Sequence, residues 1–237
     1  MKRILIFILL LMLLRVPAMA AQCGEVVPSD GNGCRECALG DLGADAIRAE
    51  TGADIALLPA GELGISLLPG PVTDGSLADS FPRDGEIVTT ELTPEALRAL
   101  LEESVSRIVL TREETIDETA SAWEGFLCVS GFRFSYDASA PAGERVYELS
   151  VDGPVTAAAP AELLSGTAAG TLRSAVAAYC EAEGTVTPPD TDRIFVRGAG
   201  ENAIVGRRIP KSFVIVVAVV AMIFGGFRYR KRLRTER

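Results

Sequence analysis

The stretch from Leu39 to Leu58, LGDLGADAIRAETGADIALL, joins a helical pattern to a strand pattern. Its apolar residues first recur at helical spacing, which predicts a helix over Leu39–Thr51 with one buried face. Gly52 is expected to end this helix, because glycine readily takes the left-handed conformation common at helix C-termini. The apolar run Ile55–Leu58 then predicts a short strand, bounded by Pro59.

Helical and strand patterns continue to alternate along the chain. Thr73 is expected to cap a single turn that runs to Phe81, and Thr171 a last helix through Ala182. A further helix is predicted to begin at Pro94, because Thr93 is a favoured N-cap residue and proline is favoured at the first helical position. The predicted strands are 86–92, 126–129, 132–136, 146–151 and 194–196, with a loop or marginal helix over 108–124 and a biased alanine- and glycine-rich stretch over 157–170. This interleaving predicts a mixed α/β (α+β) fold rather than a bundle or a sandwich.

Charge is distributed unevenly along the chain. The whole sequence has a net charge of −9, but residues 21–206 contain eleven arginines, no lysine and thirty-one acidic residues. Nine basic residues lie between Arg207 and the C-terminus. A body this acidic repels phosphate backbones, so nucleic acid is not expected as a partner.

The composition also excludes several catalytic chemistries. The sequence has no histidine, and residues 21–206 have no lysine. Ser–His or Cys–His nucleophiles, histidine-bridged metal centres and Schiff-base mechanisms all require one of these residues. We therefore predict no catalytic residue, no metal ligand and no cofactor.

The two ends of the chain have the patterns of membrane-targeting segments. Residues 1–20 combine a basic start, an apolar run and the motif Ala18-Met19-Ala20, which predicts a cleaved signal peptide. A second apolar run predicts a transmembrane helix over 210–228, followed by a basic cytoplasmic tail over 229–237. The body is accordingly expected to be periplasmic or extracellular.

Other interpretations of the two ends remain open. Acylation of Cys23 would make the protein a lipoprotein, although Gln22 stands where a small residue is wanted. An uncleaved N-terminal anchor would need a longer apolar run than Arg15 allows. The C-terminal run and tail also resemble a sorting signal that surface-processing systems remove.

Five cysteines suit an oxidising compartment, where disulfides are the default. A segment over 21–36 contains two of them, and Cys34-Arg35-Glu36-Cys37 forms a C-x-x-C motif. A redox or metal role would need a thioredoxin-like context or histidines, so the motif is interpreted as structural. The disulfide candidates are Cys23, Cys34, Cys37, Cys128 and Cys180.

Several short sequence motifs occur in an order that resembles the C-terminal domain of 5′-nucleotidases. The resemblance runs from Cys37 to Ala182, within a predicted domain over 37–206. The matching motifs are 39–46 (LGDLGADA), 51–57 (TGADIAL), 70–73 (GPVT), 124–131 (EGFLCVSG), 136–137 (YD) and 143–146 (GERV), together with the predicted strand 88–92 and the predicted helix 97–106.

This resemblance implies layered mixed sheets with helices and a role in binding the nucleoside part of a substrate. In that family, a separate N-terminal metallophosphoesterase domain carries the two metals and the hydrolytic machinery. Only 16 residues separate the predicted cleavage site from Cys37. The resemblance thus implies a fold and a binding role without independent catalysis.

The chain departs from the family pattern where the family contacts its ligand. Pro59–Gly64 replaces a glycine-rich loop that ends in a substrate-binding arginine, and places Glu62 there. Pro82–Gly85 replaces a Pro-Phe-Gly-Asn-like turn, and Ala157–Gly170 replaces a strand and a loop that bears an aromatic ring. Phe126 matches a ring-bearing position, so the nucleoside-binding residues implied are Phe126, Gly125 and Arg107.

Three functions compete on these observations. The first is an extracytoplasmic module that binds a nucleoside or docks a protein. The second is the substrate-binding subunit of a split hydrolase, whose partner is a separate metallophosphoesterase or another envelope protein. The third is a structural spacer. On that view Phe126 is a core residue, and Arg107 and Arg133 satisfy neighbouring carboxylates. Asp41 and Asp45 would then form a solvated helix start.

Overall fold

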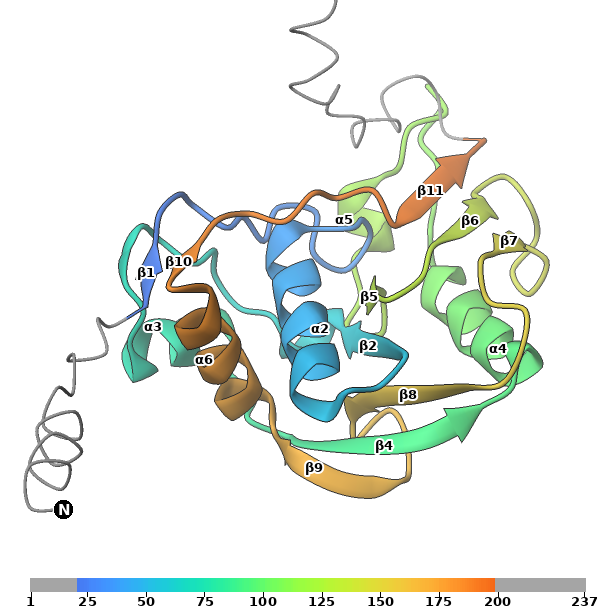
Figure 1. The fold of residues 1–237 in the computed structure, drawn as a ribbon. Helices are drawn as coiled ribbons and strands as arrows, with labels where there is room; N and C mark the ends of the chain where they lie inside the picture. Colours follow the sequence, from blue (N-terminus) through green and yellow to red (C-terminus); the bar gives the residue numbers. More distant parts are fainter. Residues whose placement is uncertain (1–20, 199–237) are drawn as a thin grey trace, which may run out of the picture. The chain divides into compact units, whose positions relative to one another are not determined.

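A computed structural model describes residues 21–198 (Figure 1). Its central element is a five-stranded mixed sheet with strand order β5-β2-β8-β4-β9. These strands are β2 (Ile55–Pro59), β4 (Glu86–Leu92), β5 (Leu127–Ser130), β8 (Val155–Pro160) and β9 (Thr167–Thr171). Strands β2 and β8 run parallel to each other, and β5 and β4 run antiparallel to them. The C-terminal ends of β2 and β8 therefore lie at the same edge of the sheet as the N-terminal ends of β5 and β4.

Both faces of this sheet are buried. Successive side chains of a strand point to opposite faces, and β2 divides its apolar residues accordingly. Ala56 and Leu58 belong to one hydrophobic core, and Ile55 and Leu57 belong to a second. The continuous apolar run of β2 is therefore the pattern of a strand covered on both sides.

Three helices cover the first face: α2 (Ala38–Thr51), α6 (Leu172–Glu183) and α3 (Asp74–Ser80) (Figure 1). Gly43 lets α2 approach the sheet closely, because a Cβ atom there would lie 2.5 Å from Cδ2 of Leu58. A small sheet of order β10-β1-β3 accompanies these helices. Its strands are β1 (Gln22–Cys23), β3 (Gly70–Pro71) and β10 (Thr185–Val186).

The second face packs against α4 (Pro94–Val105) and a sheet of order β11-β6-β7. The strands of that sheet are β6 (Phe134–Asp137), β7 (Val146–Leu149) and β11 (Ile194–Arg197). Two short helical turns, η1 (Ala60–Glu62) and α5 (Glu118–Ser121), complete the elements. After β10 the chain crosses over α2 to reach β11 (Figure 1).

The mixed α/β prediction is confirmed, and most predicted elements lie within a residue or two of their expected bounds. Thr73 and Thr93 cap α3 and α4 as expected, with side chains that accept hydrogen bonds from Ser76 N and Ala96 N. Two strands of the central sheet were missed, β8 and β9, which both overlap the stretch Ala157–Gly170, as were the two-residue strands β1, β3 and β10 of the small sheet. Alanine and glycine have low strand propensity, and burial between two layers overrides it here.

The predicted fold class needs one correction, which concerns the membrane. Among the helices within residues 21–198, none is long and apolar enough to cross a bilayer. The described fold is therefore a mixed α/β domain with three sheets and without a transmembrane helix. The segments predicted as signal peptide (1–20), transmembrane helix (210–228) and basic tail (229–237) lie outside the described residues.

The predicted disulfides are also corrected, since all five cysteines are free and buried. Their thiols are packed within the apolar cores rather than joined. Burial raises the pKa of Cys34 and of Cys180 to about 11. The thiols of Cys37 and Cys128 are hydrogen-bonded to each other beside the first turn of α2.

Candidate ligand-binding site

Three of the segments that depart from the family pattern meet at one edge of the central sheet. β2 ends at Pro59, opposite Leu127 at the start of β5, and β8 ends at Pro160, opposite Ile87 in β4. Backbone hydrogen bonds continue the pairing into the loops. They run from Ala60 N to Phe126 O (2.7 Å), from Gly61 N to Glu124 O (2.8 Å) and from Ala161 N to Glu86 O (2.8 Å).

Glu62 is the most unusual residue at this edge. It ends the turn η1 with only 2% of its surface exposed, and its Oε2 atom has no hydrogen-bond partner among residues 21–198. Burial raises the pKa of Glu62, and the negative charges of Glu162 and Glu124 raise it further against the opposing effect of Arg83. A buried acceptor without a donor is costly, so this carboxyl group is suited to a ligand that brings one.

Arg83 and Glu124 form an ion pair across the same edge, with 2.9 Å between Nη2 and Oε2. Gly61 makes this arrangement possible, because a Cβ atom there would lie 2.9 Å from Nη1 of Arg83. Both side chains are well exposed, so the pair contributes little to stability and opens easily. Arg83 is thus already paired, within a group of three acidic residues.

The turn that carries Arg83 is held in place by the start of α6. Arg173 N donates to Asp84 Oδ1 (3.0 Å), the two side chains form an ion pair at 3.4 Å, and Leu172 N donates to Gly85 O (3.1 Å). A helix start fixed to a loop in this way limits its motion. The backbone that carries Arg83 is therefore held in place at this edge.

The residues predicted to bind a nucleoside lie close together in the structure. Gly125 lies against the indole of Trp123, which would be 2.3 Å from a Cβ atom at that position, and the guanidinium of Arg107 lies 4.5 Å from the centre of the same ring. Phe126 is fully buried in the second core. Its ring would need to leave the core to stack on a base, so the binding role of these residues stays a prediction.

Sequence reasoning overlooked Trp123 and the convergence of acids around Glu62. Glu62 in the Pro59–Gly64 loop was visible in the sequence as a departure from the family pattern. Glu124 and Glu162 come close to it only because β2 pairs with β5 and β8 in the folded sheet. Asp41 is fully buried rather than solvated. Within residues 21–198, no group of acidic residues or cysteines has the arrangement of a metal site.

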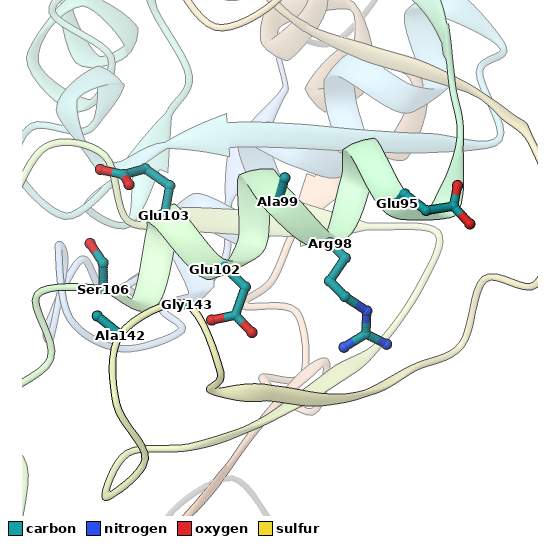
Figure 2. A pocket seen from close by; sticks show the side chains of 8 residues that line it. All are labelled: Glu95, Arg98, Ala99, Glu102, Glu103, Ser106, Ala142 and Gly143. Carbon is teal, nitrogen blue, oxygen red and sulfur yellow. The ribbon is translucent and has the colours of Figure 1, made fainter.

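A pocket of about 560 Å³ lies elsewhere, on the outer face of α4 (Figure 2). Figure 2 shows Arg98 and Glu102 extending from α4 toward the neighbouring chain. Both are already used: Arg98 donates to Val146 O, and Glu102 accepts from Arg145 N (3.0 Å) and Val146 N (2.7 Å). A ligand in this pocket would therefore compete with existing hydrogen bonds for Arg98 and Glu102.

The sequence matches the family model of the 5′-nucleotidase C-terminal domain over residues 18–160, more than half of the chain. A comparison with curated proteins finds no match. Among solved structures, the chain is similar to a 5′-nucleotidase precursor from Thermus thermophilus, with a TM-score of 0.63 and 22% identity, over 83% of this chain and 42% of that one.

Two other solved structures are similar to this chain. The sulfate thiohydrolase SoxB of Thermus thermophilus gives a TM-score of 0.61 at 23% identity, over 79% of this chain and 36% of that one. The NAD nucleotidase of Haemophilus influenzae gives a TM-score of 0.55 at 13% identity, over 76% of this chain and 37% of that one. At these identities the likeness shows the fold alone, and the chain spans less than half the length of each protein.

Proposed function

The chain belongs to the family of 5′-nucleotidase C-terminal domains, and on that premise we propose that it is a binding module for nucleosides without hydrolytic activity of its own. The family's fold is that of a substrate-binding domain. The absence of histidine from the sequence supports the lack of hydrolysis, since the family's dinuclear centre needs such ligands. The signal-peptide pattern of residues 1–20 supports a location outside the cytoplasm, which N-terminal sequencing of the purified protein tests.

The carboxyl group of Glu62 carries this proposal. Its unpartnered oxygen lies where three altered loops meet, beside the acidic residues 124 and 162. Hydroxyl and amino groups donate hydrogen bonds to such an acceptor, whereas a phosphate has only acceptors and a like charge. A nucleoside, with its ribose hydroxyls and base amino groups, therefore suits this edge better than a nucleotide.

Calorimetric titration of the purified protein with adenosine, AMP and UMP tests the proposal. We expect adenosine to bind more tightly than AMP, and no phosphate release with or without divalent metal. Glu62→Gln should weaken adenosine binding about tenfold, since a hydrogen bond to a charged group contributes about 1.5–3 kcal/mol. Glu181→Gln, an exposed position on α6, is the matched control and should leave binding unchanged. Tighter binding of AMP than adenosine, or hydrolysis by the pure chain, would contradict the proposal.

A second candidate is the substrate-binding subunit of a split nucleotidase. The observation that favours it is a group of exposed apolar side chains directly after the Glu62 loop. Ile65 and Leu68 are 60% and 62% exposed, and Val26 joins them through the bridge between Val27 and Leu67. Exposed apolar groups that adjoin a ligand site are typical of a surface covered by a partner.

Mixing the purified protein with a separately encoded metallophosphoesterase tests this second candidate. We expect a complex with nucleotidase activity that neither protein has alone, and its loss in Ile65→Asp. Val109→Asp, at an exposed apolar position elsewhere, should keep the complex. If Ile65→Asp and Val109→Asp behave alike, the apolar group around Ile65 is not the contact surface.

A further inference from the structure

A second pocket, of about 410 Å³, lies at the opposite edge of the central sheet. The register of β2 with β5 places Pro59 and Leu127 at the Glu62 edge, and Ala56 and Ser130 at the other. Residues from α2, from the turn after β5 and from the segment before β11 line the pocket. Three of the eleven arginines between residues 21 and 206 are among them, in a body that is otherwise acidic.

Two of these arginines are already neutralised. Arg193 forms a two-pronged ion pair with Asp45, with Nη1–Oδ1 at 3.0 Å and Nη2–Oδ2 at 2.7 Å. Arg133 forms an exposed ion pair with Asp192 at 2.8 Å. The remaining cation is Arg48, so the pocket has one unpaired positive charge.

The side chain of Arg48 is held in place although it is exposed. Its Nε donates to Ser130 Oγ at 3.0 Å, and that hydroxyl in turn donates to Asp45 Oδ1 at 2.5 Å. Its stem lies over Gly131, whose φ of +86° and missing side chain leave room for it. A Cβ atom there would lie 3.1 Å from Cδ of Arg48. Among residues 21–198, the Arg48 guanidinium makes this one hydrogen bond through Nε and no ion pair, so its two terminal nitrogens are not engaged.

We propose that this pocket binds a small oxyanion, such as a phosphate or carboxylate group, with Arg48 as its principal ligand. A guanidinium with a fixed stem and free terminal nitrogens presents the fork that matches two oxygens of such a group. Arg133 is the second donor, because its exposed pair with Asp192 opens at small cost. This site is separate from the Glu62 edge. It favours an anionic group, whereas the acidic Glu62 edge disfavours one.

Titration of the full-length protein with sodium phosphate, sulfate and acetate tests the proposal, with sodium chloride at matched ionic strength as reference. We expect saturable binding of at least one oxyanion, and at least a tenfold loss of affinity in Arg48→Gln. Arg48→Lys should lose affinity by a smaller factor, because lysine keeps the charge without the fork. Arg112→Gln removes the same charge at an exposed position outside the pocket and should bind like the wild type.

The choice of anion identifies the ligand class: a preference for phosphate and sulfate indicates a tetrahedral group, and a preference for acetate indicates a carboxylate. Two results would overturn the proposal. One is a response to chloride equal to that of the oxyanions, which indicates screening alone. The other is an equal loss in Arg48→Gln and Arg112→Gln. Circular dichroism of each variant distinguishes lost binding from lost folding, and Arg48→Lys supplies the test if Arg48→Gln does not fold.

Discussion

At the scale of single residues, two buried acids show how far the environment of a side chain departs from what its type suggests. Asp41 stands in the first turn of α2, a position where an acid usually faces solvent and favours the helix dipole. Here both of its carboxylate oxygens are buried, beside Glu36 and with Nη1 of Arg193 3.9 Å from Oδ1, and within residues 21–198 neither oxygen has a hydrogen bond of good geometry. Burial, together with the neighbouring Glu36, raises the pKa of Asp41 to about 10.

This shift predicts a protein that is less stable in mild alkali than in mild acid. The folded protein keeps a proton on Asp41 that the unfolded chain releases above its ordinary pKa of 3.8, so the free energy of unfolding falls as the pH rises toward 10. Glu36 and Glu62, whose pKa values burial also raises, act in the same direction. The melting temperature should therefore decrease from pH 5 to pH 8.

Asp41→Asn should flatten this dependence and stabilise the protein by on the order of 2 kcal/mol at pH 8, because the amide has no proton to lose. Thermal unfolding at several pH values measures both effects. An equally steep dependence in Asp41→Asn would show that another group holds the proton.

At the scale of elements, β8 shows tertiary context overriding local propensity. The strand contains three consecutive alanines, Ala157–Ala159, and each is fully buried. The strand lies between β2 and β4 in the middle of the sheet, with helices on one side and a second core on the other. Small side chains are needed where both faces are tightly covered.

Ala158→Val should accordingly destabilise the protein by about 1–3 kcal/mol, even though valine has the higher strand propensity, because the added methyl groups overpack the first core. Thr156→Val, on an exposed position of the same strand, should change stability by less than about 0.5 kcal/mol. Urea unfolding of the two variants gives the comparison. A neutral Ala158→Val would mean that the space beside β8 is looser than the structure indicates.

At the scale of the whole described domain, one arginine joins the two ends of the fold. Arg193, near the C-terminal end of the described chain, pairs with Asp45 of α2 and donates to Val129 O in β5 at 2.7 Å. Glu36 accepts hydrogen bonds from the backbone of the same segment, at 2.9 Å from Arg193 N and 3.1 Å from Ile194 N. These contacts hold β11 against the rest of the domain.

Arg193→Gln should reduce the free energy of unfolding by about 3 kcal/mol, because it leaves Asp45 largely buried without its cation. Arg197→Gln breaks an exposed pair with Asp137 and should cost less than about 1 kcal/mol. Chemical denaturation distinguishes the two. Similar losses in both variants would show that the burial of the Arg193 pair adds nothing.

Much of the fold follows from local patterns in the sequence. Helix α2, strand β2 and the capped helix α4 were predictable because their spacing, their caps and the Gly52 stop all agree. The resemblance to the family rests in part on sequence motifs within these same elements. The site was only partly predictable: the altered loops are visible in the sequence, but the meeting of Glu62, Arg83 and Glu124 is not.

By itself, then, the sequence determined the α/β class, the main helices and strands, the acidic character of the body and the lack of histidine chemistry. Only the tertiary structure decided that an alanine-rich stretch forms the central strand β8, and that Asp41 and Glu62 are buried. It also decided that Arg48 alone is left unpaired in its pocket. Local patterns depend on neighbours in the chain, whereas burial and charge pairing depend on residues that only the folded chain brings together.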